Sequence, residues 1–150
     1  MRLYLDTSVY GGYFEPEFEK WTRLMFERIR MNRDVILFSS VVTTELEGAP
    51  AHVQELLVSI PTRQLQLVEL DEAAIELADA YLAAKVVGRT SLADCRHIAM
   101  ATLARANALV SWNFKHIVSL ERIYGYNSVN LRSGYPMLEI RSPIDLMSHG

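Results

Sequence analysis

Short apolar runs alternate with helical segments along the chain, and this alternation constrains the fold more than any other feature. Strands are expected at residues 3–5, 35–38, 65–70, 109–112 and 137–140. Helices are expected at residues 18–32, 40–48, 51–59, 72–87 and 91–106, with a turn at 7–12. Because strands that alternate with helices form parallel sheets covered on both faces, we predict an α/β fold with three layers and a mostly parallel central sheet.

Residues that begin or end helices set the expected boundaries of these segments. Ser39, Asp71 and Ser91 have side chains that cap the amino end of a helix. Gly88 is expected to end the helix that follows Asp71. These positions predict separate helices between the strands rather than one long helix.

The chain is long enough for one sizeable core, since half of its 150 residues are hydrophobic. We therefore expect a single domain over residues 1–150. No apolar run approaches the ~20 residues needed to cross a bilayer, so no membrane association and a cytoplasmic location are expected. Cys95 is the only cysteine, and His97 has no second His or Cys at metal spacing, so we expect neither a disulfide nor a zinc site.

The net charge of −3 argues against a protein that coats nucleic acid through many basic side chains. It remains compatible with a nuclease, because an acidic metal site would itself use several carboxylates. Charge alone therefore does not separate these classes.

Polar side chains follow two of the expected strands directly. Asp6 comes after the strand at 3–5 and Asn113 after the strand at 109–112. Ligands of open parallel sheets bind beyond the carboxyl ends of the strands, so these two oxygen donors should lie side by side. Glu45 follows Val42 and Val41 by three and four residues, which places it on the inward face of its helix.

Asp94 lies in the first turn of the helix before the strand at 109–112, near enough to reach the same crevice. Carboxylates that converge repel one another unless a cation neutralises them, and oxygen donors without Cys or paired His favour Mg²⁺ or Mn²⁺. Such a site suits phosphodiester hydrolysis. We predict that the metal and catalytic residues are Asp6, Glu45, Asp94 and Asn113.

Five further residues are candidates for contacts with the substrate or the attacking water. Thr7 and Ser8 can hold a water or a carboxylate through their hydroxyls. Arg96, Lys115 and His116 are the nearest basic candidates for phosphate.

Each predicted ligand also has a structural interpretation when taken alone. Ser91 and Asp94 have the spacing of a reciprocal helix cap, and Asp6 can cap or turn the chain. Glu45 can be a solvated helix residue, and Asn113 can turn the chain after its strand. Only their joint placement favours a metal site.

Four segments in this order are similar to those of the PIN-domain family, a nuclease fold that includes toxins of many toxin–antitoxin pairs. The segments are residues 3–9, 39–46, 94–102 and 108–116, and the resemblance runs from Arg2 to about Val118. The order of the four, at matching points of the strand and helix pattern, carries the resemblance.

The resemblance implies a PIN-like fold and a metal-dependent endoribonuclease, with Mg²⁺ or Mn²⁺ as cofactor and RNA as substrate. It also implies a homodimer and, for a toxin of the type II kind, a cognate antitoxin partner. Asp6, Glu45 and Asp94 match the first three acids of the family. The fourth acid is replaced by Asn113, which has a carbonyl oxygen but no charge, so weaker metal binding is expected.

Two other functions remain open at this stage. A phosphatase of the haloacid-dehalogenase kind also begins with a strand that ends in Asp, but it needs a second Asp where this chain has Ser8. A catalytically silent module would bind RNA or protein in the same crevice without cleavage, and Asn113 is the residue that favours it.

Overall fold

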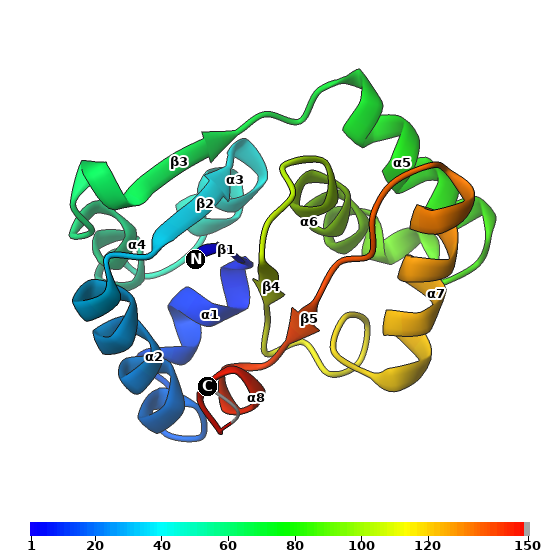
Figure 1. Cartoon of the computed structure of the whole chain (residues 1–150). Coiled ribbons are helices and arrows are strands. Elements are labelled where there is room, and N and C mark those ends of the chain that lie inside the picture. The colour runs from blue at the N-terminus through cyan, green and yellow to red at the C-terminus, as the bar shows by residue number, and fades with distance from the viewer. Residues whose placement is uncertain (149–150) are drawn as a thin grey trace.

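A five-stranded sheet, parallel throughout, forms the centre of the chain in a computed structural model that describes residues 1–148 (Figure 1). The strand order is β3-β2-β1-β4-β5. The strands are β1 (Arg2–Leu5), β2 (Val35–Ser39), β3 (Leu65–Val68), β4 (Ala108–Val110) and β5 (Ile140–Arg141). The predicted α/β fold with a parallel sheet is confirmed.

Helices cover both faces of the sheet, with α1, α2 and α8 on one side and α5, α6 and α7 on the other (Figure 1). The helices are α1 (Thr7–Gly12), α2 (Glu19–Asn32), α3 (Ser40–Glu47), α4 (Ala51–Val58), α5 (Glu72–Ala83), α6 (Leu92–Leu103), α7 (Leu120–Arg132) and α8 (Pro143–Ser148). Short 3₁₀ turns cover Thr62–Gln64 and Arg89–Ser91. Within residues 1–148, no helix has the length and apolar character to cross a membrane.

Two of the predicted caps form as expected. The Ser39 hydroxyl accepts a hydrogen bond from the Val42 amide at 3.4 Å and begins α3. The Asp71 carboxylate accepts one from the Ala74 amide at 2.9 Å and begins α5. Both caps satisfy amides that have no partner within their helix.

The ends of α5 and α6 were predicted less well, because the chain ends these two helices without glycine. The helix from Asp71 was expected to reach residue 87, yet α5 ends at Ala83. Lys85 adopts the left-handed conformation with φ 59°, and the Val86 amide donates back to the Tyr81 carbonyl at 3.1 Å. Arg105, with φ 54°, ends α6 in the same way, before the expected residue 106. Glycine usually holds this position, so its absence concealed the ends.

Other elements differ from the sequence prediction near the functional edge and in the last third of the chain. Residues 7–12 form α1 rather than a turn. The strand expected at 109–112 ends at Val110, so Asn113 lies in the loop that follows rather than at the strand end. The last strand is at Ile140–Arg141, and α7 and α8 were not predicted.

Trp112 fixes the loop that carries Asn113. Its indole stacks on Phe18 with ring centroids 4.4 Å apart, and its Nε1 donates to the Thr22 hydroxyl at 2.9 Å. A Cβ added at Gly12 would lie 2.7 Å from this indole. The close approach of Gly12 and Trp112 therefore joins this loop to α1 and α2.

We expect Gly12→Ala to lower the free energy of unfolding by about 1–3 kcal/mol, because the added methyl overlaps the buried indole. Urea denaturation measures this change. Gly11→Ala is the matched control in the same helix, since its Cβ would approach only the movable Glu15 side chain, at 3.3 Å. Equal losses in the two variants would contradict this account of the packing.

Candidate functional site

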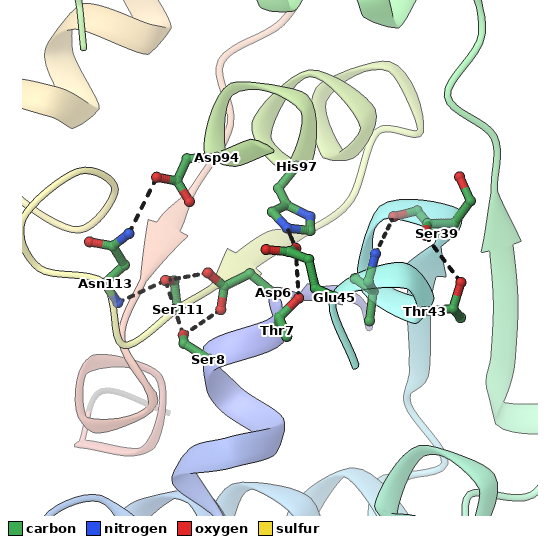
Figure 2. A network of polar contacts seen from close by, with 12 residues as sticks. Asp6, Thr7, Ser8, Ser39, Thr43, Glu45, Asp94, His97, Ser111 and Asn113 are labelled. Carbon is green, nitrogen blue, oxygen red and sulfur yellow. Dashed lines mark hydrogen bonds and ion pairs between the residues drawn. The ribbon is translucent and has the colours of Figure 1, made fainter. Parts of the chain in front are cut away.

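Asp6 lies between β1 and α1 and is almost wholly buried, with 4% of its surface exposed. Its amide donates to the Val110 carbonyl at 3.1 Å, which fixes it beside β4. Its carboxylate accepts hydrogen bonds from the Ser8 hydroxyl at 2.5 Å and the Ser111 hydroxyl at 2.8 Å (Figure 2). Both carboxylate oxygens are thus held in place by neighbouring side chains.

Burial raises the pKa of the Asp6 carboxyl, because a charge is poorly solvated there. The charge of His97 and the two serine hydroxyls lower this pKa again, and the charge of Glu45 adds to the rise. The net direction is upward, so the charged form of Asp6 is disfavoured in the folded protein unless a cation is near.

Glu45 extends from α3 toward α6, where it meets His97. The His97 Nε2 lies 2.6 Å from Glu45 Oε1, and the Thr7 hydroxyl donates to the same oxygen at 2.9 Å (Figure 2). On the other side of the imidazole, Nδ1 lies 2.7 Å from the Tyr4 hydroxyl, which lies 2.8 Å from the Ser39 hydroxyl. A buried chain of polar contacts therefore runs from the cap of α3 to the carboxylate that α3 carries.

The pKa of Glu45 is lowered, although partial burial by itself would raise it. The hydrogen bond and charge of His97 outweigh the burial, and the Thr7 hydroxyl adds to the lowering. Sequence analysis placed His97 on its helix without a role in the site. A histidine one helical turn after Asp94 was the available signal, because residues three apart share a helix face.

Asp94 faces the loop after β4 and accepts a hydrogen bond from Asn113 Nδ2 at 3.4 Å (Figure 2). The Asn113 side-chain Oδ1 accepts a hydrogen bond from the His116 amide at 2.9 Å. Ser91 makes no side-chain capping bond to α6, so the alternative interpretation of Asp94 as half of a reciprocal cap is not realised. Asn113, by contrast, does turn its loop, and it presents its amide nitrogen to Asp94.

Burial raises the pKa of the Asp94 carboxyl, and the charges of Asp6 and Glu45 raise it further. The charges of His97 and His116 act in the opposite direction without reversing the rise. The charge of Glu45 raises the pKa of both Asp6 and Asp94, as expected for acids that lie close together at the carboxyl edge of the sheet.

The basic residues predicted to bind phosphate are placed less uniformly. Arg96 lies on α6 with its Nε buried and without a hydrogen-bond partner. His116 has a buried Nδ1 without a partner, in the loop that faces Asp94. Lys115 is exposed in the same loop. Of these three, His116 is the one whose charge affects the pKa of Asp94, which it lowers.

The donor chemistry of the edge fits a hard divalent cation. The buried Asp6 and the partly buried Asp94 have raised pKa values, and neither they nor Glu45 has a lysine or arginine partner in residues 1–148. In this structure, however, the three carboxylates do not converge on one point. In that same part of the chain, no three His, Cys, Asp or Glu side chains are grouped as metal ligands. Asp94 is turned toward Asn113, and Glu45 toward His97.

Comparison with known proteins bears on the fold of the chain. No protein-family model and no curated protein sequence matches the chain. A chain of the crystal structure of VapBC2 from Rickettsia felis bound to a DNA fragment from their promoter is similar, with a TM-score of 0.58 and 16% identity. The match covers 95% of this chain and 98% of that chain. The chain has a PIN-like fold. In this PIN-like chain, Asp6, Glu45, Asp94 and Asn113 all lie at one edge of the sheet.

We expect His97→Ala to lower the free energy of unfolding by about 2–4 kcal/mol, because it leaves a cavity and removes a partner from Tyr4 and Glu45. The pKa of Glu45 should rise in this variant, as measured by NMR titration. Since the folded pKa of Glu45 is lowered, its contribution is present above the unfolded pKa and is lost as pH falls through the folded pKa.

Glu47→Gln is the matched control for the titration, because Glu47 is exposed on the same helix. It should leave both the stability and the pKa of Glu45 unchanged. An unchanged pKa of Glu45 in His97→Ala would contradict the positioning role assigned to His97.

Proposed function

We propose that this chain is a divalent-metal-dependent endoribonuclease, in which Asp6, Glu45 and Asp94 hold Mg²⁺ or Mn²⁺. The observation that carries the proposal is the pair of carboxyls of Asp6, which is buried, and Asp94, which is partly buried: both have raised pKa values, and within residues 1–148 neither has a lysine or arginine partner. A structure retains such an unfavourable arrangement most readily where a ligand uses it. The PIN-like fold supports the assignment as an analogy.

The surrounding residues have distinct parts in the proposed mechanism. When bound, the metal would activate a water and stabilise the charge that develops on the phosphoryl oxygens. Ser8 and Ser111 orient the Asp6 carboxylate through their hydroxyls. Thr7 and His97 hold one oxygen of Glu45, which leaves its other oxygen available to a ligand or a water. These positioning contacts preorganise the acids before substrate arrives.

The proposal extends to the biological setting implied by the PIN resemblance. We infer that the chain acts as the toxin of a type II pair, as a homodimer, with RNA as substrate and a cognate antitoxin as partner. The similarity to a chain of the VapBC2 structure supports this setting.

A catalytically silent module that binds RNA or protein is the second candidate function. The amide nitrogen that Asn113 presents to Asp94 favours it, since this group already supplies Asp94 with a hydrogen bond. The two functions differ in one property: a nuclease cleaves RNA with a metal and loses this activity in Asp6→Asn, whereas a silent module does not cleave at all.

We expect wild-type protein to cleave a mixed pool of single-stranded and structured RNA with Mn²⁺ or Mg²⁺ and not with EDTA. Asp6→Asn should reduce the cleavage rate by roughly 100-fold or more, because it removes the buried negative charge that holds the metal. Gel analysis of end-labelled RNA measures the rate. Asp79→Asn, at an exposed position of α5, is the matched control and should cleave normally.

We expect Asn113→Asp to have opposite effects on metal-free stability and on metal affinity. A carboxylate at residue 113 would keep the cap to the His116 amide but face Asp94 with a like charge, so the metal-free protein should unfold at lower temperature. Mn²⁺ should then raise the melting temperature more than in wild type, because binding to the folded state stabilises it. Identical Mn²⁺ shifts in both proteins would argue against a ligand role for this position.

A further inference from the structure

A pocket of about 340 Å³ opens beside the candidate catalytic edge, where α1, α3 and α4 meet. Its size is in the range of small-ligand sites. The residues of interest in its lining are Thr7, Gly11, Phe14, Glu15, Leu46 and His52. None of the residues that line it is a lysine or an arginine.

The pocket is continuous with the site of the acids. Thr7 lines the pocket and donates its hydroxyl hydrogen bond to Glu45 at 2.9 Å. Leu46, another lining residue, directly follows Glu45 on α3. A substrate with one group bound in this pocket could therefore place its adjoining atoms next to the acids.

The lining combines two aromatic rings with one carboxylate. Phe14 and His52 meet edge to face, with ring centroids 4.6 Å apart. Unpaired bases of RNA stack on side chains of this kind. Glu15 is exposed, and a carboxylate can only accept hydrogen bonds.

These features favour a base over a phosphate, because the carboxylate of Glu15 repels phosphate and no lysine or arginine lines the pocket to offset that repulsion. Among the four bases, guanine offers a carboxylate two adjacent N–H donors on its Watson–Crick edge, from N1 and N2. Uracil offers a single N–H flanked by two carbonyl oxygens, which a carboxylate repels. Glu15 is thus suited to guanine and unsuited to uracil.

The absence of a side chain at Gly11 leaves space in the pocket next to the Glu15 carboxylate. A Cβ added at Gly11 would lie 3.3 Å from Glu15 Oε1, so any larger residue would crowd the carboxylate. Alanine is also a better helix former than glycine, so Gly11→Ala narrows the pocket without weakening α1.

We propose that this pocket binds one unpaired guanine of the RNA substrate, packed against the edge-to-face pair of Phe14 and His52 and hydrogen-bonded to Glu15, next to the bond that is cut. The inference rests on the proposed ribonuclease function and specifies which base that function selects.

The test is fluorescence anisotropy with labelled heptaribonucleotides in EDTA, so that binding is measured without cleavage. We expect the heptamer with one central guanosine in oligouridine to bind wild-type protein about tenfold more tightly than heptauridine. Glu15→Gln should abolish most of that difference, and Gly11→Ala should weaken binding of the guanosine-containing heptamer. Glu17→Gln, an equally exposed glutamate outside the pocket lining, should behave as wild type.

Equal affinity for the two heptamers, or discrimination that survives Glu15→Gln, would overturn the proposal. An arginine tripeptide that binds wild type and not Glu15→Gln, in place of any guanosine preference, would overturn it in favour of a protein side chain as occupant. Because binding in EDTA needs no catalysis, failure of the ribonuclease assay with guanosine preference intact would reject only the proposed reaction.

Discussion

The position of β1 in the middle of the sheet is the constraint on which the site depends. β1 pairs in parallel with β2 on one side and β4 on the other, with Leu5 opposite Val110. The amide of Asp6 continues this pairing by donating to the Val110 carbonyl. The first acid of the site is thereby placed at the depth of the core, where water cannot solvate its charge.

At this edge of the sheet, carboxylate charges lie close together with little solvation, and neighbouring hydroxyl groups reduce the energetic cost. Hydroxyls of Ser8 and Ser111 stabilise the charged form of Asp6, while the charge of Glu45 opposes it. His97 stabilises the charged form of Glu45, and the Tyr4 hydroxyl contacts the other nitrogen of the His97 ring. Burial of the Asp6 charge destabilises the fold, and the hydrogen bonds to it offset part of this cost. Such incompletely compensated charges are common at ligand-binding sites.

Much of the first two thirds of the chain could be predicted because local signals and tertiary structure agree there. The caps at Ser39 and Asp71 are local hydrogen bonds that a side chain makes within its own turn. α7 escaped prediction because its stability is tertiary: the buried Asn127 side chain bonds both backbone groups of Leu138. A Cβ added at Gly125 in the same helix would lie 2.7 Å from Val86, so a weak helix former is required where the chain segments touch.

The sequence by itself determined the order of the five strands and of helices α2 to α6, the α/β class and the place of Asp6 directly after β1, since these follow from periodicity and local capping. Only the tertiary structure decided which neighbours each polar residue would meet. The contacts of Ser111 with Asp6 and of His97 with Glu45 join residues 105 and 52 positions apart. No local pattern encodes such contacts, because they arise when the parallel strands and α6 bring distant segments to one edge of the sheet.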